Sequence, residues 1–293
     1  MRSILVLRGG ALGDFIVTLP TLAALRRQWP GARIELAGNA TAAQLARARG
    51  LLDAVHSQHE ARWGALFGSD PLPREFADWL AGFDLVLSYW PDPDGALAQR
   101  FPRHEGQRFL CAPALPTRGP AASHYAEPLQ RLGIPPPAPH CLITPLRPAD
   151  PPAARAIAVH PGSGGRRKNW PAENWRRLIA DLPPPVTLIL GEVELERADE
   201  FAVPGVDLLR APPLEDLVVH LAGCRLFLGH DSGVSHLAAA CGAPCVLLFG
   251  PTDPAIWSPP APRVRVLQCG PDLASLPVPE VRDAVRRALE DQT

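Results

Sequence analysis

The sequence predicts an α/β protein made of two tandem domains, each with a parallel β-sheet between helices. Short, nearly all-apolar runs alternate with segments of helical periodicity, as in βαβ units, and this alternation stops in the Pro-rich stretch 134–152 and then resumes. The 293 residues also reach the size at which one core stops growing, about 250 to 300 residues. We therefore expect one domain over 1–150, including the Pro-rich linker, and a second over 151–293, with their strand ends facing across a cleft.

The first domain opens with a βαβ unit. Ser3–Arg8 is an apolar run typical of a buried parallel strand, a glycine turn follows, and a helix begins at Asp14 and continues to Trp29-Pro30-Gly31. The next strand is expected at 32–37. The rest of this domain is predicted to contain helices near 41–49, 73–81 and 124–132, and strands near 54–57, 85–89 and 108–111.

The second domain repeats the alternation. Its predicted strands lie at 156–160, 186–191, 206–210, in the run before Asp231, in the run that ends at Gly250, and at 264–268. Its predicted helices begin at 171 and 192 and cover 214–222, 234–241 and 279–290.

Composition excludes several classes of protein. The formal net charge of −1, with scattered basic residues, argues against a nucleic-acid-binding surface. The N-terminus lacks the pattern of a secretory signal, and no apolar run approaches the roughly 18 residues of a membrane span, so we expect a cytoplasmic protein. Six Cys occur without a CxxC pair.

No metal site is expected. His236, Cys241 and Cys245 lack the spacing of zinc ligands, and Asp92-Pro93-Asp94, which superficially resembles a metal-diphosphate motif, is better explained as a turn with Asx caps.

Asp14 follows the first strand and the turn made by Gly9, Gly10 and Gly13. The turn is not GxGxxG, and a carboxylate would repel a pyrophosphate there, which argues against a dinucleotide site. Asp14 is either a carboxylate that caps its helix or an ionised carboxylate at a ligand-binding strand end, able to accept a proton from an attacking sugar hydroxyl.

Two segments of the second domain can bind an anion. Gly162 to Gly165, followed by three cations that end at Lys168, can surround a phosphate with backbone N–H groups and a charge, or form a solvated basic loop. The helix that starts near Gly233 directly after a strand presents unpaired N–H groups and the positive end of its dipole. Asp231 or Ser232 caps that helix in the alternative interpretation, and we expect Asp231 to be a cap that holds the turn.

Three blocks in the chain resemble glycosyltransferase family 9, the ADP-heptose:lipopolysaccharide heptosyltransferases. They are ILVLRGGALGDFIVTLPTLAALRRQWPGARIELA, VHPGSGGRRKNWPAENWRRLI and LFLGHDSGVSHLAAACGAPCVLLFGPTDP. The resemblance implies a GT-B fold of two Rossmann-like domains, with the acceptor mainly on the first and the nucleotide-sugar on the second. It also implies an inverting, metal-independent transfer with no cofactor besides the nucleotide-sugar co-substrate, expected to be ADP-heptose.

The resemblance also implies roles for individual residues. Asp14 matches the family's candidate general base, and Lys168 matches the cation that meets the donor diphosphate. Glu194, with Glu192 as the alternative, approximately matches an acidic residue used for the ribose. The remaining donor-binding candidates lie in the loop after 160, in the Asp-Ser-Gly turn and at a neighbouring strand end, and are Ser163, Gly164, Asp231, Ser232, Gly233, Val234, His236 and Thr252.

The expected function is transfer of a heptose or related sugar to a saccharide or glycolipid acceptor in lipopolysaccharide or surface-glycan synthesis, with a peripheral contact to the inner membrane surface as one option. Residues 58–122 give no recognisable acceptor pattern, so acceptor identity stays open. Two alternatives share the architecture: a sugar-nucleotide epimerase of the GT-B type and a non-catalytic nucleotide-sugar binding module.

Overall fold

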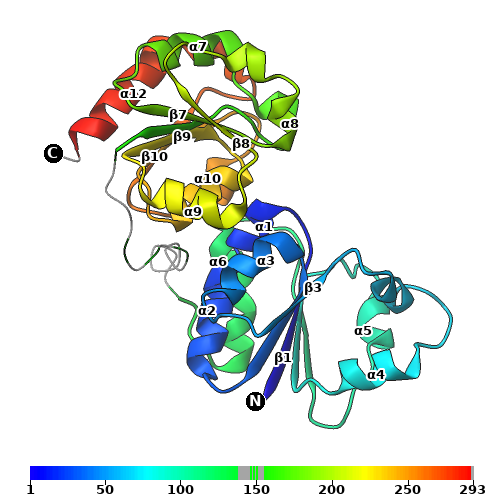
Figure 1. The fold of residues 1–293 in the computed structure, drawn as a ribbon. Helices are drawn as coiled ribbons and strands as arrows, with labels where there is room; N and C mark the ends of the chain where they lie inside the picture. Colours follow the sequence, from blue (N-terminus) through cyan, green and yellow to red (C-terminus); the bar gives the residue numbers. More distant parts are fainter. Residues whose placement is uncertain (138–145, 147, 149, 151–154, 292–293) are drawn as a thin grey trace. The chain divides into compact units, whose positions relative to one another are not determined.

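The computed structural model describes residues 1–137, 146, 148, 150 and 155–291, so most of the predicted linker lies outside the described residues. The chain divides into two compact units. Unit 1 consists of Met1–Thr117 and Ala122–Pro137, and unit 2 consists of Arg118–Ala121 and Ala138–Thr293. Each unit is an α/β domain with a fully parallel sheet, as the sequence predicts (Figure 1).

Unit 1 contains a five-stranded sheet in the order β3-β2-β1-β4-β5. Its strands are β1 (Ser3–Arg8), β2 (Arg33–Gly38), β3 (Ala54–Ser57), β4 (Leu85–Ser88) and β5 (Arg108–Cys111). Its helices are α1 (Leu12–Ile16), α2 (Leu19–Gln28), α3 (Ala40–Arg47), α4 (Arg74–Ala81), α5 (Ala96–Arg100) and α6 (Ala121–Ala126), with the 3₁₀ helices η1 (Ala61–Leu66) and η2 (Glu127–Leu132).

The sheet of unit 1 is covered on both faces, which explains why its strands are almost entirely apolar. Leu5 and Leu7 of β1 pack in one cluster with side chains from η1, α4 and α5, among them Trp63, Phe76 and Leu97. Figure 1 shows α2, α3 and α6 on the other side of the strands. Because the strands are parallel, β1, β4 and β5 end at one edge, where Leu7 lies beside Ser88 and Ser88 beside Cys111.

Two predicted helices of unit 1 are wrong in detail, for the same reason. The helix expected from Asp14 is two helices, α1 and α2, because Pro20 has no N–H to continue the hydrogen-bond ladder. The helix expected near 124–132 is α6 followed by η2, with Pro128 at the break. Asp14 therefore lies inside α1, which begins at Leu12.

Unit 2 contains a six-stranded sheet in the order β11-β10-β9-β6-β7-β8. Its strands are β6 (Ile157–His160), β7 (Val186–Leu190), β8 (Asp207–Arg210), β9 (Leu226–His230), β10 (Cys245–Phe249) and β11 (Val264–Gln268). Its helices are η4 (Arg166–Lys168), α7 (Ala172–Ala180), α8 (Glu192–Leu195), η5 (Ala198–Phe201), α9 (Leu214–Ala222), α10 (Gly233–Ala240), α11 (Pro254–Trp257), η6 (Leu273–Ser275) and α12 (Val278–Glu290).

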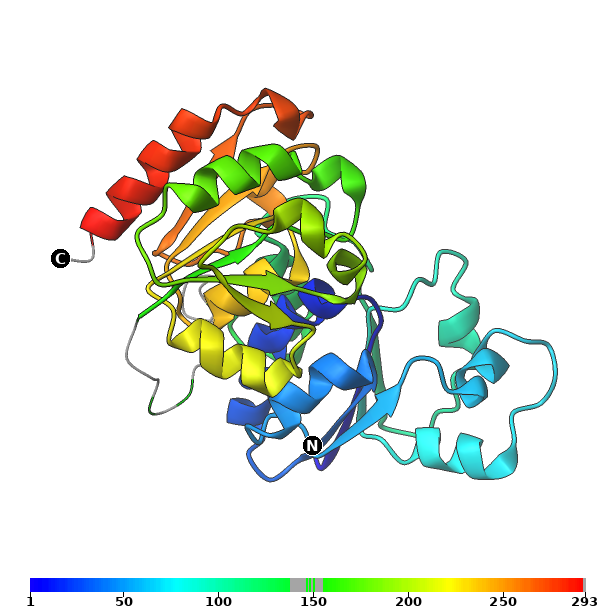
Figure 2. The ribbon, with the colours of Figure 1, turned by 45° about the horizontal axis from the view of Figure 1, so that its top comes forward.

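One face of this sheet carries the main core of unit 2. The long α12 lies beside α7 (Figure 2, red and green), and both contribute apolar side chains such as Trp175, Val281 and Val285 to a cluster over β6, β7, β9 and β10. In the described part of the chain, no helix has both the length and the hydropathy to cross a membrane.

Candidate functional site

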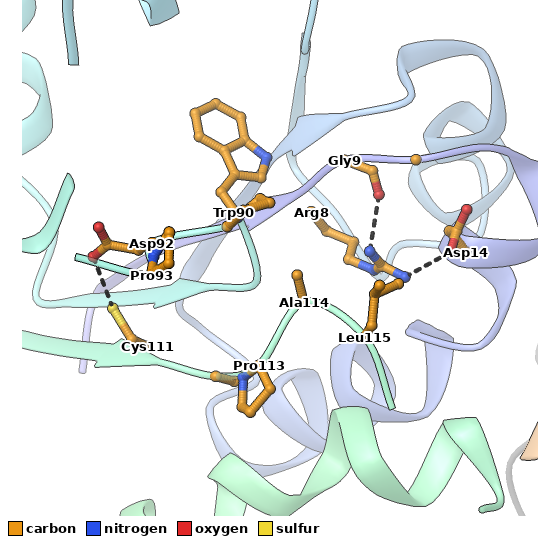
Figure 3. A pocket seen from close by; sticks show the side chains of 13 residues that line it. Arg8, Gly9, Asp14, Trp90, Asp92, Pro93, Cys111, Pro113, Ala114 and Leu115 are labelled. Carbon is orange, nitrogen blue, oxygen red and sulfur yellow. Dashed lines mark hydrogen bonds and ion pairs between the residues drawn. The ribbon is translucent and has the colours of Figure 1, made fainter. Parts of the chain in front are cut away.

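A cavity of about 770 Å³ opens at the carboxyl ends of β1, β4 and β5 in unit 1. This is within the usual range of small-molecule sites, about 300 to 1,000 Å³. Three segments line it: the end of β1 with the start of α1, the residues after β4, and the loop after β5 (Figure 3). Its walls are largely Pro, Trp and aliphatic carbon, and its lining residues are Arg8, Gly9, Gly10, Asp14, Trp90, Pro91, Asp92, Pro93, Cys111, Ala112, Pro113, Ala114 and Leu115.

Asp14 lines this cavity and is held by two contacts. Its Oδ2 accepts a hydrogen bond from the N–H of Ala11 at 2.9 Å, and its Oδ1 pairs with Arg8 Nη2 at 3.1 Å. Ala11 is the N-cap of α1, so Asp14 closes the helix start from the third helical position rather than as the N-cap. The capping interpretation is thus wrong in position, and the carboxylate still faces a cavity at a strand end.

Arg8 fixes the orientation of Asp14 and was not predicted as a site residue. Its side chain is 5% exposed, and it also donates to the Gly9 carbonyl at 3.0 Å (Figure 3). A further nitrogen, Nε, donates to Thr18 Oγ1 at 3.1 Å. The guanidinium lies 4.3 Å from the centroid of the Tyr125 ring. A cation at the end of an otherwise apolar strand was the sequence signal that could have identified it.

Gly10 permits this arrangement. Its φ of +110° is one that side-chain-bearing residues rarely adopt, and a Cβ there would lie 2.6 Å from Asp14 Oδ2. Any larger residue at this position would displace the carboxylate.

Asp92 and Asp94 form a capped turn, as predicted. Asp92 accepts hydrogen bonds from the N–H groups of Leu97 and Ala98 at 2.9 and 3.0 Å, and Asp94 accepts one from Ala96 at 3.1 Å. These bonds hold the start of α5. Burial and the nearby Asp92 carboxylate raise the pKa of the Cys111 thiol, so this lining residue is not an activated nucleophile.

In unit 2, two predicted residues meet at the ends of the neighbouring strands β6 and β9. Lys168, at the end of η4, pairs with Asp231 through Nζ and Oδ2 at 2.6 Å. Asp231 is buried, whereas the Lys168 side chain is 34% exposed. An ammonium group has three donors, so this contact leaves Lys168 able to bind a further anion.

Ser232, not Asp231, caps α10. The Ser232 side chain accepts a hydrogen bond from the N–H of Ser235 at 3.3 Å, and its φ and ψ are those of an extended N-cap. The expectation that Asp231 caps the turn is therefore wrong, because its carboxylate is engaged with Lys168. Gly233 and Val234 form the first turn of the helix, whose N–H groups lack intrahelical acceptors.

The remaining predicted residues occupy nearby strand ends of unit 2. Ser163 and Gly164, which follow β6, line a cavity of about 240 Å³ together with Glu194. Glu194 Oε2 accepts the N–H of Gly191 at 3.1 Å, and Glu192 is not among the lining residues. His236 is buried in the first turn of α10.

Thr252 lies after β10, and its Oγ1 is buried without a hydrogen-bond partner among the described residues. A buried hydroxyl of this kind is normally hydrogen-bonded.

His230, the last residue of β9, was missed at the sequence level. Its ring is fully buried, its Nε2 accepts the N–H of Trp170 at 2.8 Å, and its Nδ1 lies 3.3 Å from the Gly162 carbonyl. Burial lowers the pKa of His230 to about 3, so the ring is neutral at physiological pH. The signal available was a His at the end of an apolar run, directly before the predicted anion-binding turn.

The Asp14 cavity belongs to unit 1 and the Lys168 group belongs to unit 2, and the predicted cleft between the domains stays a prediction. Among the residues that the structure describes, no three His, Cys, Asp or Glu side chains form a group that could hold a metal ion.

The chain is similar to known glycosyltransferases in sequence and in structure. The sequence model of glycosyltransferase family 9 (heptosyltransferase) matches residues 142–276. Lipopolysaccharide heptosyltransferase 1 of Escherichia coli K12 is 39% identical over 95 residues, an alignment that spans 30% of this chain and 30% of that protein. The matched sequence is thus less than a third of that relative's length.

Solved structures match over nearly the whole chain. The E. coli heptosyltransferase WaaC with ADP superposes with a TM-score of 0.75 at 22% identity, covering 98% of this chain and 99% of that one. A glycosyl transferase family 9 protein from Veillonella parvula DSM 2008 superposes with a TM-score of 0.77 at 20% identity, covering 99% and 98%. The predicted fold class and the predicted resemblance to glycosyltransferase family 9 are confirmed.

Proposed function

We propose, from the confirmed likeness to glycosyltransferase family 9, that this chain transfers a heptose or a related sugar from an ADP-activated donor to a saccharide hydroxyl. The observation that carries the proposal is the ion pair between Lys168 and Asp231, which places a cation beside the start of α10. These residues all lie in the segment that the family model matches. A cation beside a helix N-terminus is suited to a diphosphate. The choice of a heptose follows from the similarity to lipopolysaccharide heptosyltransferase 1.

On the donor side, the N–H groups of Gly233 and Val234 and the Lys168 ammonium would hold the diphosphate. Ser163 and Gly164 would lie near the same phosphates, and Glu194 would accept hydrogen bonds from the ribose hydroxyls, since its carboxylate lines the adjoining cavity and that of Glu192 does not. As the bond to the sugar breaks, these groups stabilise the negative charge that develops on the leaving diphosphate.

On the acceptor side, Asp14 would act as general base. The acceptor oxygen attacks the anomeric carbon from the face opposite the diphosphate, which inverts the configuration and needs no metal. The new C–O bond forms while the bond to the diphosphate breaks, the diphosphate leaves with the electron pair, and the hydroxyl proton goes to Asp14. Arg8 holds the carboxylate in place for this transfer.

We further propose that unit 1 binds a saccharide or glycolipid acceptor and that the protein acts in the cytoplasm at the inner membrane, where a lipid-linked acceptor is accessible. The cavity around Asp14 supports the first statement, because its apolar walls can pack against sugar rings.

The test of donor class is a melting-shift screen of the full chain with ADP, GDP and UDP, followed by ADP-heptose with and without saccharide acceptors. ADP should stabilise the protein most, and mass spectrometry should detect a heptosylated product that forms only with acceptor. Conversion of ADP-heptose to an isomer without acceptor would instead identify an epimerase. Donor binding with neither isomer nor product would identify a binding module.

A further inference from the structure

His230 connects three segments of unit 2 that are far apart in sequence. Its ring accepts the N–H of Trp170 and contacts the Gly162 carbonyl, and its own backbone leads directly into Asp231. Ser163 follows Gly162, and Lys168 lies two residues before Trp170. Ser163, Lys168 and Asp231 therefore each lie one or two residues from His230 or from a residue that its ring contacts.

The contacts determine which nitrogen carries the proton. A backbone N–H can only donate, so Nε2 must be the unprotonated acceptor for Trp170. Nδ1 then carries the hydrogen and donates to the Gly162 carbonyl, 3.3 Å away. The ring is wholly enclosed and packs edge-on against Trp175, with centroids 5.2 Å apart. A neutral ring in one tautomer therefore joins a donor on one loop to an acceptor on the other.

We propose that His230 is a positioning residue for diphosphate binding, because it holds the Gly162–Ser163 loop and the Lys168–Trp170 segment at fixed spacing beside the start of α10. This inference rests on the proposed function, in which these segments bind the donor diphosphate. The Lys168–Asp231 ion pair, 2.6 Å between Nζ and Oδ2, also joins the Lys168–Trp170 segment to the residue that follows His230.

Two amide substitutions separate the two bonds. In His230→Gln, Oε1 can reach the place of Nε2 and accept from Trp170, while the bond to Gly162 is lost. In His230→Asn, the amide nitrogen can take the place of Nδ1 and donate to Gly162, while the buried N–H of Trp170 loses its acceptor. An unpaired buried N–H costs more than a long hydrogen bond contributes, so the two variants should differ.

The experiment measures the affinities of the full chain for ADP and for adenosine by calorimetry. We expect ADP to bind about threefold more weakly to His230→Gln and about tenfold more weakly to His230→Asn, as loss of one buried bond predicts. Adenosine, which has no phosphates, should bind each variant as it binds the wild type. A general loss of structure would weaken both ligands together.

His220→Asn is the control, because His220 is a half-buried His of unit 2 that lines a different cavity with Arg155 and Cys224. It should leave both affinities unchanged. Unchanged ADP affinity in folded His230→Asn, or equal losses for ADP and adenosine, would overturn the inference. If His230→Asn does not fold, His230→Gln decides, and wild-type ADP affinity in that variant contradicts the inference.

The outcomes also separate this inference from the proposed function. If the wild type binds GDP or UDP rather than ADP, the donor assignment fails, and the same variants are tested with the nucleotide that binds. If ADP binds and no sugar is transferred, the proposed activity fails while the positioning role is still measured. If no nucleoside diphosphate binds, both are wrong.

Discussion

At the scale of single residues, a substitution of Asp14 tests the proposed proton transfer most directly. Asp14→Asn keeps the size of the side chain and removes the base, so we expect the transfer rate to fall by about 10² to 10⁴. The affinity for ADP should not change, because Asp14 lies in unit 1 and the proposed donor-binding residues lie in unit 2. ADP release from ADP-heptose in the presence of acceptor measures the rate.

Asp92→Asn provides the comparison for Asp14→Asn. Asp92 lines the same cavity, and within the described part of the chain its carboxylate accepts hydrogen bonds from the N–H groups of Leu97 and Ala98 and from the Cys111 thiol. The single amide oxygen of Asn can keep one of the two bonds to the start of α5, so this variant should retain most of the activity. Equal rate losses in the two variants would remove the special role of Asp14.

Substitutions of Lys168 test the proposed binding site for the leaving diphosphate. Lys168→Met should weaken ADP binding by about 10- to 100-fold, the size expected for loss of a hydrogen bond to a charged group, and Lys168→Arg should recover part of it. Arg167→Met is the matched control, since Arg167 is an adjacent exposed cation. If both Met variants lose ADP affinity equally, the loop provides only a diffuse positive field.

At the scale of secondary structure, apolar periodicity predicted the described strands to within about two residues, because buried parallel strands leave a continuous apolar run. It failed where proline interrupts a helical pattern, at Pro20 and Pro128. It also missed α5, which has only five residues and so shows no clear periodicity. The start of this helix is stabilised by hydrogen bonds to Asp92.

The candidate site divides in the same way. Asp14, Lys168 and the start of α10 follow recognisable motifs, so they could be predicted. Arg8 and His230 were missed. A polar residue at the end of an apolar strand marks each position, but their contacts with residues distant in sequence, such as Tyr125 and Trp170, are visible only in the structure.

Two neighbouring strands, β6 and β9, end in buried His residues, which predicts acid sensitivity of unit 2. Burial lowers the pKa of both His160 and His230 below the unfolded value of about 6.5. The unfolded state therefore binds more protons below that pH, and stability is lost as pH falls from about 6.5 towards the folded pKa, by about 1.4 kcal/mol per pH unit for each group.

Melting temperatures between pH 7.5 and pH 5 test this expectation. The melting temperature of the wild type should fall steadily below about pH 6.5. That of His230→Gln should fall less, because one of the two buried His residues is absent. His59→Gln, at an exposed position, should behave as the wild type does. A pH profile in His230→Gln as steep as that of the wild type would contradict the burial effect.

At the scale of the whole molecule, the two units divide the proposed work between acceptor and donor. Leu115 allows a test, because it lines the Asp14 cavity and its side chain is 67% exposed. Leu115→Asp should raise the KM for the acceptor and leave the melting temperature and ADP affinity unchanged, since an exposed position tolerates the charge.

Val219→Asp introduces the same charge at an exposed apolar position of unit 2 that lies outside the proposed donor site. It should change neither acceptor KM nor ADP affinity. If Leu115→Asp behaves like this control, the acceptor does not enter the cavity. The sequence could not predict the shape of this cavity, because most of the residues that line it lie on loops without periodicity.

The way the Asp14 cavity is assembled has a consequence for engineering. Asp14, the proposed proton acceptor, is fixed by β1 and α1 through Arg8, Ala11 and the glycine at position 10, whereas much of the remaining wall comes from the segments 90–93 and 111–115. Libraries confined to those two segments would vary acceptor choice while the proton-transfer geometry is inherited intact. Retargeting this scaffold to new sugars is therefore a problem of two short loops rather than of the fold.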